Sequence, residues 1–292
     1  MIDQFLNYLR FERNRSMQTV ERYERSLRDF EAFFKSQDEE LTWASVDADI
    51  IRRWMESLMD RGNIANTVGT GLSALRSFFR FALARQLVSS DPAHHITAPR
   101  KHKPLPQFVK EGEADWLIDE AGWKESYKDV RARTIIILLY ETGIRRGELT
   151  ALNDNDVDFA ARQLKVTGKR NKQRIVPFGE ELETALRSYI SLRDKSVGKC
   201  SEALFLDNRG RRMNGGQVYY EVRAHLTGAT AVKKKSPHVL RHSFATAMLN
   251  HGAGLESVRQ LLGHESLQTT QIYTHTTFEQ LRQVYKKSHP RG

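Results

Sequence analysis

A tyrosine near the C-terminus is the first candidate for chemistry in this sequence. Tyr273 lies in "GHESLQTTQIYTH", residues 263–275. Most tyrosines pack their ring and hydrogen-bond their hydroxyl, and "QIYTH" alone is typical of such a residue. A free phenol has a pKa near 10, so only about one in a thousand is ionised at neutral pH. Tyr273 can act as a nucleophile only if cationic groups from elsewhere in the chain stabilise its anion.

The start of a predicted helix offers such cations. In "KKKSPHVLRHSFATAML", Ser236 suits the N-cap and Pro237 the first helical position. His238 and Arg241 are then three residues apart on one face of the opening turns. An imidazole and a guanidinium beside free backbone N–H groups form an anion site that fits a phosphate.

A second arginine site follows a predicted helix break. "TGIRRGEL" ends one helix at Gly143 and begins another near Gly147, with Arg145 and Arg146 at the junction. Arginine recognises phosphate through two parallel hydrogen bonds, so two such sites could bracket one phosphodiester. The alternative is that Glu148 forms a structural salt bridge with one of the two, Arg146 in particular.

These residue types together indicate attack of a phenol on a phosphodiester. The product would be a phosphotyrosine ester, and two guanidiniums would stabilise the extra negative charge of five-coordinate phosphorus. Without a metal, an acid must protonate the departing sugar oxygen. Lys169, in the predicted hairpin turn "GKRNKQR", is the best-placed type of residue for that step.

Other sites are excluded by their spacing. Asp154–Asp158 begins like a calcium loop, but Phe159 stands where glycine is needed. His238 and His242 are four apart without the glutamate or cysteine partners of a zinc site. "TGKRNK" lacks the glycine spacing of a nucleoside-triphosphate loop, and no strand–GxGxxG–helix unit exists. We therefore expect no metal and no cofactor.

The composition favours a nucleic-acid partner. The chain has 292 residues, and 46 Lys+Arg against 36 Asp+Glu give a net charge of +10. A positive field attracts polyanions, although a basic surface also serves solubility. Seven basic residues of the linker, the hairpin turn and the segment before the His238 helix are candidate DNA contacts: Lys101, Lys103, Arg170, Lys172, Arg174, Lys234 and Lys235.

The location predicted is the cytoplasm. The longest apolar run, residues 135–140, is far too short for a membrane span, so no membrane partner is expected. The charged N-terminus lacks the apolar core of a signal peptide. Cys200 is the only cysteine, which suits a reducing compartment.

Two domains are predicted. Four of the seven prolines fall within residues 91–106, which predicts a basic linker at 99–107, with a long surface loop as the alternative. Residues 1–98 show only helical periodicity, as in the stripe Val20, Tyr23, Leu27, Phe30 and Phe34. They predict a bundle of about four helices with basic outer faces. Residues 108–292 are mixed: "FAARQLKV" and "RIVPF" predict two strands, and the rest is mainly helical.

The motifs that carry the candidate chemistry resemble those of the tyrosine recombinases, the phage-integrase family. The matching contexts are "TGIRRGEL", "GKRNKQRIVP", "HVLRHSFAT" and "LLGHESLQTTQIYTH". The resemblance covers almost the whole chain and is strongest to the Xer subgroup. One departure is Arg170, where many Xer proteins have glycine after the lysine.

The resemblance implies a role for each matching residue. Arg145 and Arg241 would hold the scissile phosphate, and Tyr273 would attack it to leave a 3′-phosphotyrosyl link. Lys169 would be the general acid. His238 would transfer a proton with the nucleophile, and His264 would hydrogen-bond the phosphate.

The fold implied is mainly α with a small antiparallel β-sheet. An all-helical core-binding domain and a mixed α+β catalytic domain would close around DNA as a C-shaped clamp. A tail helix at 277–292 would dock on the neighbouring subunit.

The assembly implied is a tetramer on two double-stranded DNA sites with inverted repeats. A second recombinase and an FtsK-type translocase are further partners that the subgroup suggests, and the bacterial nucleoid is the expected location. Chromosome dimer resolution at a dif-like site is the favoured role. An integrase of a phage or mobile element, a type IB topoisomerase and a DNA-binding accessory factor are the alternatives.

Overall fold

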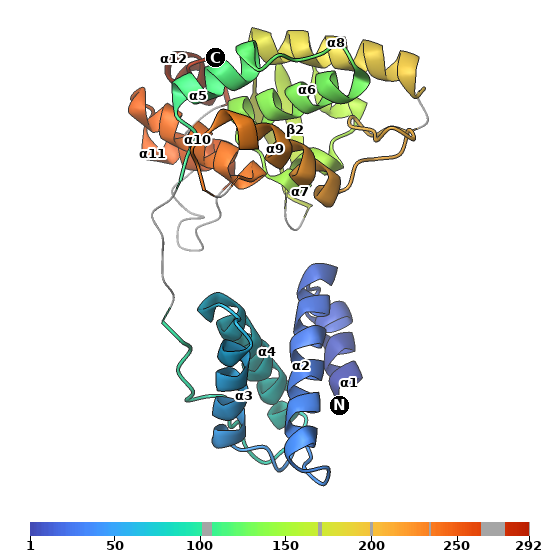
Figure 1. Cartoon of the computed structure of the whole chain (residues 1–292), viewed down its shortest axis with the longest axis vertical. Coiled ribbons are helices and arrows are strands. Elements are labelled where there is room, and N and C mark those ends of the chain that lie inside the picture. The colour runs from blue at the N-terminus through green and yellow to red at the C-terminus, as the bar shows by residue number, and fades with distance from the viewer. Residues whose placement is uncertain (101–106, 169–170, 199–200, 234, 264–277, 292) are drawn as a thin grey trace. The chain divides into compact units, whose positions relative to one another are not determined.

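The protein divides into two compact units, Met1–Pro104 and Leu105–Gly292 (Figure 1). The computed structural model describes residues 1–100, 107–168, 171–198, 201–233, 235–263 and 278–291. The division falls inside the predicted linker at 99–107. Among the described residues, every helix is too short or too polar to cross a membrane.

The N-terminal unit is a helical bundle. Its elements are α1 (Ile2–Asn7), the π-helical turn η1 (Tyr8–Glu12), α2 (Met17–Gln37), α3 (Ala48–Asp60) and α4 (Ala65–Ala84). The predicted stripe of α2 lies in the core of this unit, where Val20, Leu27, Phe30 and Phe34 are fully buried and Tyr23 is partly buried against them. Aromatic rings fill much of that core, as in the pair Trp43 and Phe78, whose centroids are 4.3 Å apart.

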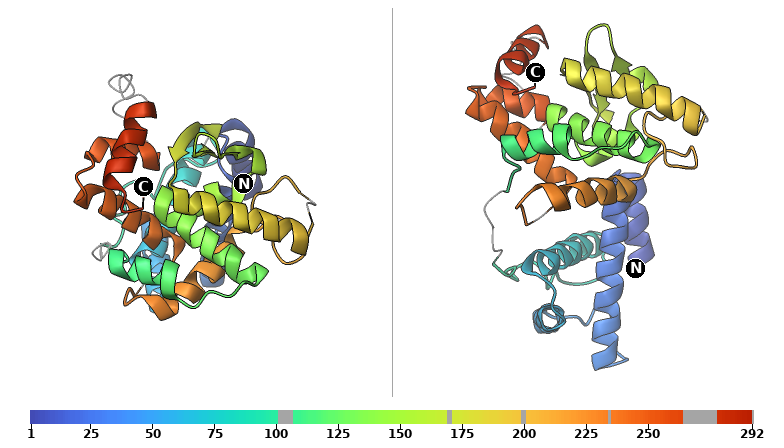
Figure 2. Two further views of the ribbon diagram at one scale, coloured as in Figure 1. Left: turned by 90° about the horizontal axis from the view of Figure 1, so that it is seen from above. Right: turned by 45° about the horizontal axis from the view of Figure 1, so that its top comes forward.

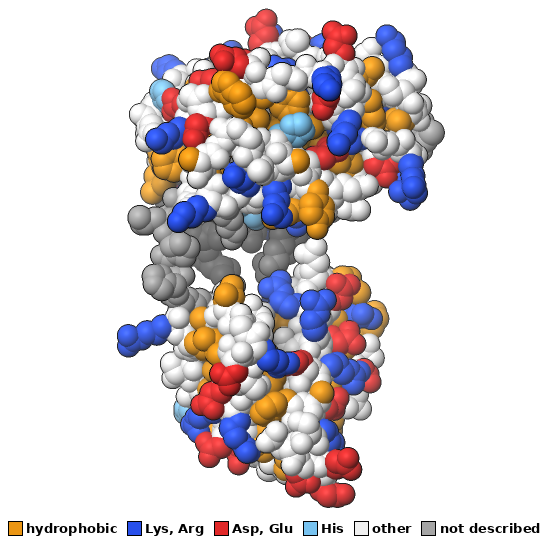
Figure 3. Space-filling model, in the orientation of Figure 1, with side chains coloured by type: hydrophobic (Ala, Val, Ile, Leu, Met, Phe, Trp, Pro, Cys, Tyr) orange, Lys and Arg blue, Asp and Glu red, His pale blue; other side chains and the backbone are white. Residues whose placement is uncertain are grey.

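The surface of the helical bundle carries charges of both signs. On the face drawn in Figure 3, Lys and Arg side chains are interspersed with Asp and Glu. Ion pairs between its helices include Arg61 with Asp29 at 3.1 Å and Arg85 with Glu12 at 2.9 Å. The basic outer faces expected from the sequence are thus of mixed charge in this view.

The C-terminal unit combines helices with one small sheet. Its elements are α5 (Glu111–Asp115), η2 (Trp116–Glu120), α6 (Tyr127–Thr142), α7 (Arg146–Ala151), η3 (Asp154–Asp156), β1 (Val157–Asp158), β2 (Gln163–Thr167), β3 (Gln173–Pro177), α8 (Glu180–Ser196), α9 (Gly215–Ala229), α10 (Pro237–Asn250), α11 (Leu255–Leu262) and α12 (Phe278–Ser288). The sheet is antiparallel in the order β1-β2-β3, and Leu164 pairs with Val176 in the predicted hairpin. The first predicted strand, residues 159–166, begins only at Gln163 because residues 159–162 form a turn, and the two-residue strand β1 was not predicted.

Helix α6 is the centre of this unit. It packs against α8, α9 and α10, and Figure 2 shows α8 running beside it. The run Ile135–Tyr140 is buried on every side, which explains why it has no polar face. The helix ends at Gly143, whose φ of 59° is the left-handed conformation of a C-cap.

The tail helix differs from the expectation in its end, while its docking on a neighbouring subunit stays a prediction. It was predicted to span 277–292 and to dock on a neighbouring subunit. In the structure of the single chain, α12 ends at Ser288 and packs against α10, α11 and β3 of its own chain. Tyr285 is 1% exposed in a cluster with Phe244 and Leu261, so burial of this apolar face stabilises the docking within one chain.

Candidate active site

The junction between α6 and α7 and the end of α11 form the centre of the candidate site. Arg241 of α10 extends into this centre from the interior of the unit and is only 8% exposed. Its Nη1 donates to the carbonyl oxygen of Gly143 at 2.5 Å, and its Nη2 donates to that of Leu262 at 2.8 Å. The guanidinium is therefore held by backbone atoms from two different elements.

Gly143 is required at this junction. A Cβ atom there would lie 2.5 Å from the ring of Phe244 and 2.7 Å from Leu262. Its positive φ also disfavours any side chain. The "TG" of the sequence motif is therefore explained by packing and by the carbonyl that Gly143 presents to Arg241.

Arg145 is the N-cap residue of α7 and is paired with Glu148. The backbone N–H of Arg145 donates to Oε2 of Glu148 at 2.8 Å, and its Nη1 donates to Oε1 at 2.8 Å. Its Nη2 donates to the carbonyl oxygen of Gly263 at 2.9 Å. The side chain stays 40% exposed. This corrects the alternative considered for the sequence, since Glu148 pairs with Arg145 and not with Arg146.

Arg174 joins the same carboxylate from strand β3. Its Nη1 and Nη2 donate to the two oxygens of Glu148 at 2.9 and 2.8 Å, and its Nε donates to the carbonyl of Leu261 at 2.9 Å. The side chain is 16% exposed. The expected DNA contact of Arg174 stays a prediction, and in this geometry all three of its guanidinium nitrogens donate to groups of the protein.

The cluster has more positive than negative charge. Burial, together with the neighbouring cations Arg145 and Arg174, lowers the pKa of Arg241 to about 10 against the opposing effect of Glu148. Burial acts to raise the pKa of Glu148, but the hydrogen bonds from Arg174 and Arg145 outweigh it and hold that pKa at about 2. Three guanidiniums thus interact with one ionised carboxylate, which is the electrostatics of an anion-binding site.

The other predicted residues fall into two groups. In the first group, His238 is exposed in the first turn of α10, Lys172 lies just before β3, and Lys235 lies just before α10. Ser236 is the N-cap residue of α10 as predicted, and Pro237 begins the helix, although the Ser236 hydroxyl makes no capping hydrogen bond. Seven predicted residues lie outside the described residues: Lys101, Lys103, Lys169, Arg170, Lys234, His264 and Tyr273.

Arg146, the second arginine of the motif, is not part of the cluster. It is exposed, and its guanidinium lies over Gly215 at the start of α9, with Nε 3.2 Å from where a Cβ of that glycine would stand. The structure therefore separates two adjacent arginines that the sequence alone could not rank.

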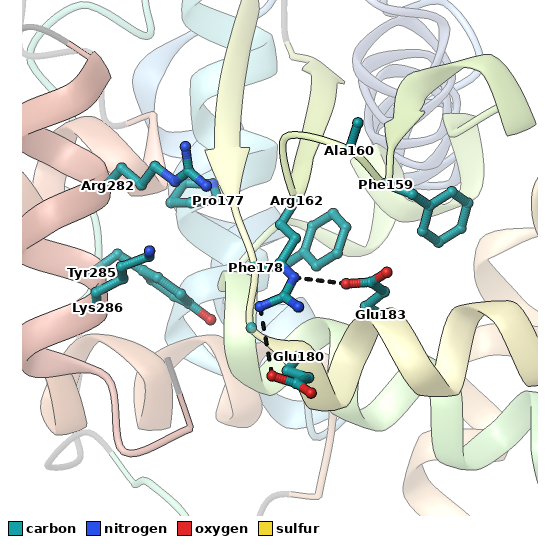
Figure 4. A pocket seen from close by; sticks show the side chains of 11 residues that line it. Phe159, Ala160, Arg162, Pro177, Phe178, Glu180, Glu183, Arg282, Tyr285 and Lys286 are labelled. Carbon is teal, nitrogen blue, oxygen red and sulfur yellow. Dashed lines mark hydrogen bonds and ion pairs between the residues drawn. The ribbon is translucent and has the colours of Figure 1, made fainter.

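A cavity of about 520 Å³ lies elsewhere in the unit, between α12, the end of β3 and the start of α8. Figure 4 shows Arg282 and Lys286 of α12 on one side and Arg162, paired with Glu180 and Glu183, on the other. Its lining has three cationic side chains and two carboxylates, whereas the arginine cluster has three guanidiniums around one carboxylate.

Comparisons with known proteins agree with the motifs. Residues 107–280 match the model of the phage integrase family, and residues 2–86 match that of the phage integrase N-terminal SAM-like domain. Two relatives are the tyrosine recombinase XerC of Pelotomaculum thermopropionicum, 37% identical, and the tyrosine recombinase XerD of Oceanobacillus iheyensis, 36% identical. Each alignment covers 100% of this chain and 98% of the relative.

The fold is also found among solved structures. The XerH site-specific recombinase bound to its difH substrate, in a pre-cleavage complex, matches with a TM-score of 0.70 and 22% identity. The alignment covers 97% of this chain and 83% of that one. At this identity the similarity concerns the fold.

Proposed function

Because the chain belongs to the phage integrase family and is a Xer-type site-specific tyrosine recombinase, we propose that its arginine cluster binds the scissile phosphate of DNA for attack by Tyr273. The observation that carries this proposal is the surplus of positive charge around Arg241. A buried guanidinium with a lowered pKa beside two other arginines is stabilised when an anion binds. A phosphodiester supplies that anion and gains further charge in the transition state.

The proposed reaction conserves the energy of the cleaved bond. The phenol oxygen of Tyr273 attacks phosphorus as His238 accepts its proton, and the bond to the 5′ oxygen breaks as Lys169 protonates it. The products are a 3′-phosphotyrosyl ester and a free 5′-hydroxyl. Attack by a 5′-hydroxyl of the partner DNA reverses the same steps, so religation needs no external energy source.

Each arginine has a distinct part in this proposal. Arg145, 40% exposed, presents its remaining N–H groups to the phosphate from the mouth of the site. Arg241, held from behind by two carbonyls, presents its own from the floor. His264 hydrogen-bonds a phosphate oxygen. Donors fixed before the reaction stabilise developing charge without reorganisation.

The wider role proposed is chromosome dimer resolution at a dif-like site with inverted repeats. The relatives named XerC and XerD support this role over that of a mobile-element integrase. The two units would close around DNA as a C-shaped clamp, and four protomers would assemble on two sites in the cytoplasm. For this assembly we propose that α12 leaves its own chain and docks on a neighbour, with a second recombinase or an FtsK-type translocase as further partners.

Covalent adduct formation tests the proposed chemistry. Purified protein is incubated with nicked duplexes that carry candidate sites, and denaturing gels detect a protein–DNA adduct. We expect an adduct with the wild type and none with Tyr273→Phe. Tyr220→Phe is the matched control, because Tyr220 is 68% exposed on α9. An adduct formed by the Tyr273→Phe variant would mean that another residue is the nucleophile. Binding of the site by the wild type without any adduct would contradict the proposed strand cleavage.

A further inference from the structure

The C-terminal end of α11 is bound by all three arginines of the cluster. The carbonyls of Leu261, Leu262 and Gly263 are consecutive, and each accepts a hydrogen bond from a different guanidinium. The donors are Nε of Arg174 at 2.9 Å, Nη2 of Arg241 at 2.8 Å and Nη2 of Arg145 at 2.9 Å. One strand, β3, and two helices, α10 and α7, thus each place an arginine at the C-terminal end of α11.

This arrangement stabilises a helix that is weak by itself. The last carbonyls of a helix have no partner within the helix and carry partial negative charge, so cations are favourable there. Helix α11 has only eight residues, too few for a stable isolated helix. Its end is therefore placed by the arginines, and in the sequence it leads directly to His264.

Arg174 donates to protein groups through all three guanidinium nitrogens, whereas the side-chain bonds of Arg145 and Arg241 come from their two Nη atoms. Its fork lies on both oxygens of Glu148, which also accept two bonds from Arg145. The carboxylate, 5% exposed, thus receives four hydrogen bonds, which is its full capacity. Arg174 connects the residue that orients Arg145 with the end of α11.

We propose, on the basis of the function above, that Arg174 is a positioning residue for strand cleavage. It fixes Glu148, which orients Arg145 towards the phosphate, and it fixes the end of α11 through Leu261. The alternative is that Arg174 contacts a DNA phosphate directly. That role would need N–H groups directed at the DNA, whereas those of Arg174 donate to Glu148 and Leu261. Only arginine can bridge both groups, because lysine has a single nitrogen and no planar fork.

The test compares Arg174→Gln, Arg174→Lys and the control Arg187→Gln. Arg187 of α8 also pairs with a glutamate, Glu183, but is 56% exposed and lies outside the cluster. Three quantities are measured: the single-turnover rate of adduct formation, the affinity for the site at several salt concentrations, and the thermal unfolding midpoint.

We expect Arg174→Gln to slow adduct formation by about 100-fold, since misplacement by about 1 Å costs that much. Site affinity should stay within about two-fold, with an unchanged salt slope, whereas loss of a phosphate contact reduces that slope by about one unit. Arg174→Lys should recover part of the rate, and Arg187→Gln should match the wild type.

A double-mutant cycle with Glu148→Gln separates positioning from a general loss of stability. If Arg174 acts through Glu148, the two effects on the rate are far from additive. The proposal is overturned by an unchanged rate, by additive effects, or by lost affinity with a shallower salt slope. Absence of an adduct in the wild type instead contradicts the proposed function, so the two failures are distinguishable.

Discussion

Arg241 and Arg291 are both largely buried guanidiniums of the C-terminal unit, but their environments shift the pKa in opposite directions. Burial and neighbouring cations lower the pKa of Arg241. Burial has the same sign at Arg291, yet hydrogen bonds with Asp119, Glu181 and Asp115 raise its pKa instead. Arg291 follows the tail helix α12 and bonds to Asp115 at 2.9 Å and to Asp119 at 2.6 Å.

One residue type thus serves two purposes in this unit. Around Arg291 the protein supplies three carboxylates, so the charge is neutralised internally and the tail is fastened to α5, η2 and α8. At Arg241 the protein supplies two carbonyls and one carboxylate shared with other arginines, so an excess of positive charge remains that an external anion can neutralise. The first arrangement is structural, and the second is suited to binding and chemistry.

The largest difference between the two arginines is expected in catalysis. Arg241→Ala should reduce adduct formation by about 1000-fold or more, because it removes donors that act on the transition state. Site affinity should change little, since many other contacts hold the DNA. Arg291→Gln is the matched comparison and should retain cleavage. Equal loss of binding and cleavage in Arg241→Ala would contradict the role assigned to it.

The backbone behind Arg241 should matter next. Gly143→Ala places a Cβ 2.5 Å from the ring of Phe244 at a positive φ, so we expect a loss of about 2–4 kcal/mol of unfolding free energy. Gly147→Ala, in the same motif, meets nothing within 4 Å and should be close to neutral. Denaturant unfolding of both variants checks this, and equal stability of the two would show that the junction tolerates a side chain.

The arginine at the tail should affect the docking of α12. Arg291→Gln should lower the free energy of docking by about 1–2 kcal/mol, because its partners Asp115 and Asp119 are half-exposed and weaken each pair. Hydrogen exchange of the α12 amides measures this, with Arg282→Gln on the same helix as control. Unchanged protection in Arg291→Gln would mean that the apolar contacts of Tyr285 alone hold the tail.

The smallest effect is a pH dependence of the same docking. Burial raises the pKa of Glu141 to about 8 from 4.5, so the stability it contributes is lost as the pH rises from 4.5 to 8. Burial lowers the pKa of His289 to about 4 from 6.5, so that residue lowers stability as the pH falls from 6.5 to 4. Stability linked to α12 should therefore be greatest between about pH 4.5 and 6.5.

Glu141→Gln tests the alkaline side, because glutamine resembles the protonated acid that Gly179 and Tyr285 contact. The wild-type unfolding midpoint should fall by about 2–4 °C more between pH 6.5 and 8 than that of the variant. Glu180→Gln, 81% exposed, is the control and should behave like the wild type. An identical decline in the wild type and in Glu141→Gln would exclude Glu141 as its cause.

Much of the site could be predicted from local sequence, because the helix ends and turns that place its residues depend on neighbouring residues in the chain. The helix break places Arg145, the N-terminal signals of α10 place Arg241, and the hairpin is readable from its turn. The partners of Arg174 could not be predicted. They lie 26 and 87 residues away, and one of them is a backbone carbonyl, which has no sequence signature.

Whether the tail helix docks on its own chain or on a neighbour could not be predicted, for a related physical reason. Its helical periodicity shows an apolar face but not which surface covers that face. In the single chain the cover is the cluster around Phe244 and Leu261, and Tyr285 completes it. The choice between the chain's own surface and a neighbour's depends on differences in binding free energy, which periodicity does not encode.

The central claim is that Tyr273 becomes covalently linked to DNA at the arginine cluster. Tryptic digestion of the adduct, followed by mass spectrometry, identifies the residue that carries the nucleotide. Cleavage after Arg259 and Arg282 gives a peptide, residues 260–282, in which Tyr273 is the only tyrosine. We predict a 3′-phosphate-linked nucleotide on Tyr273 in the wild type and no modified peptide in Arg241→Ala. A nucleotide on any other residue, or an unchanged yield in Arg241→Ala, would contradict the account.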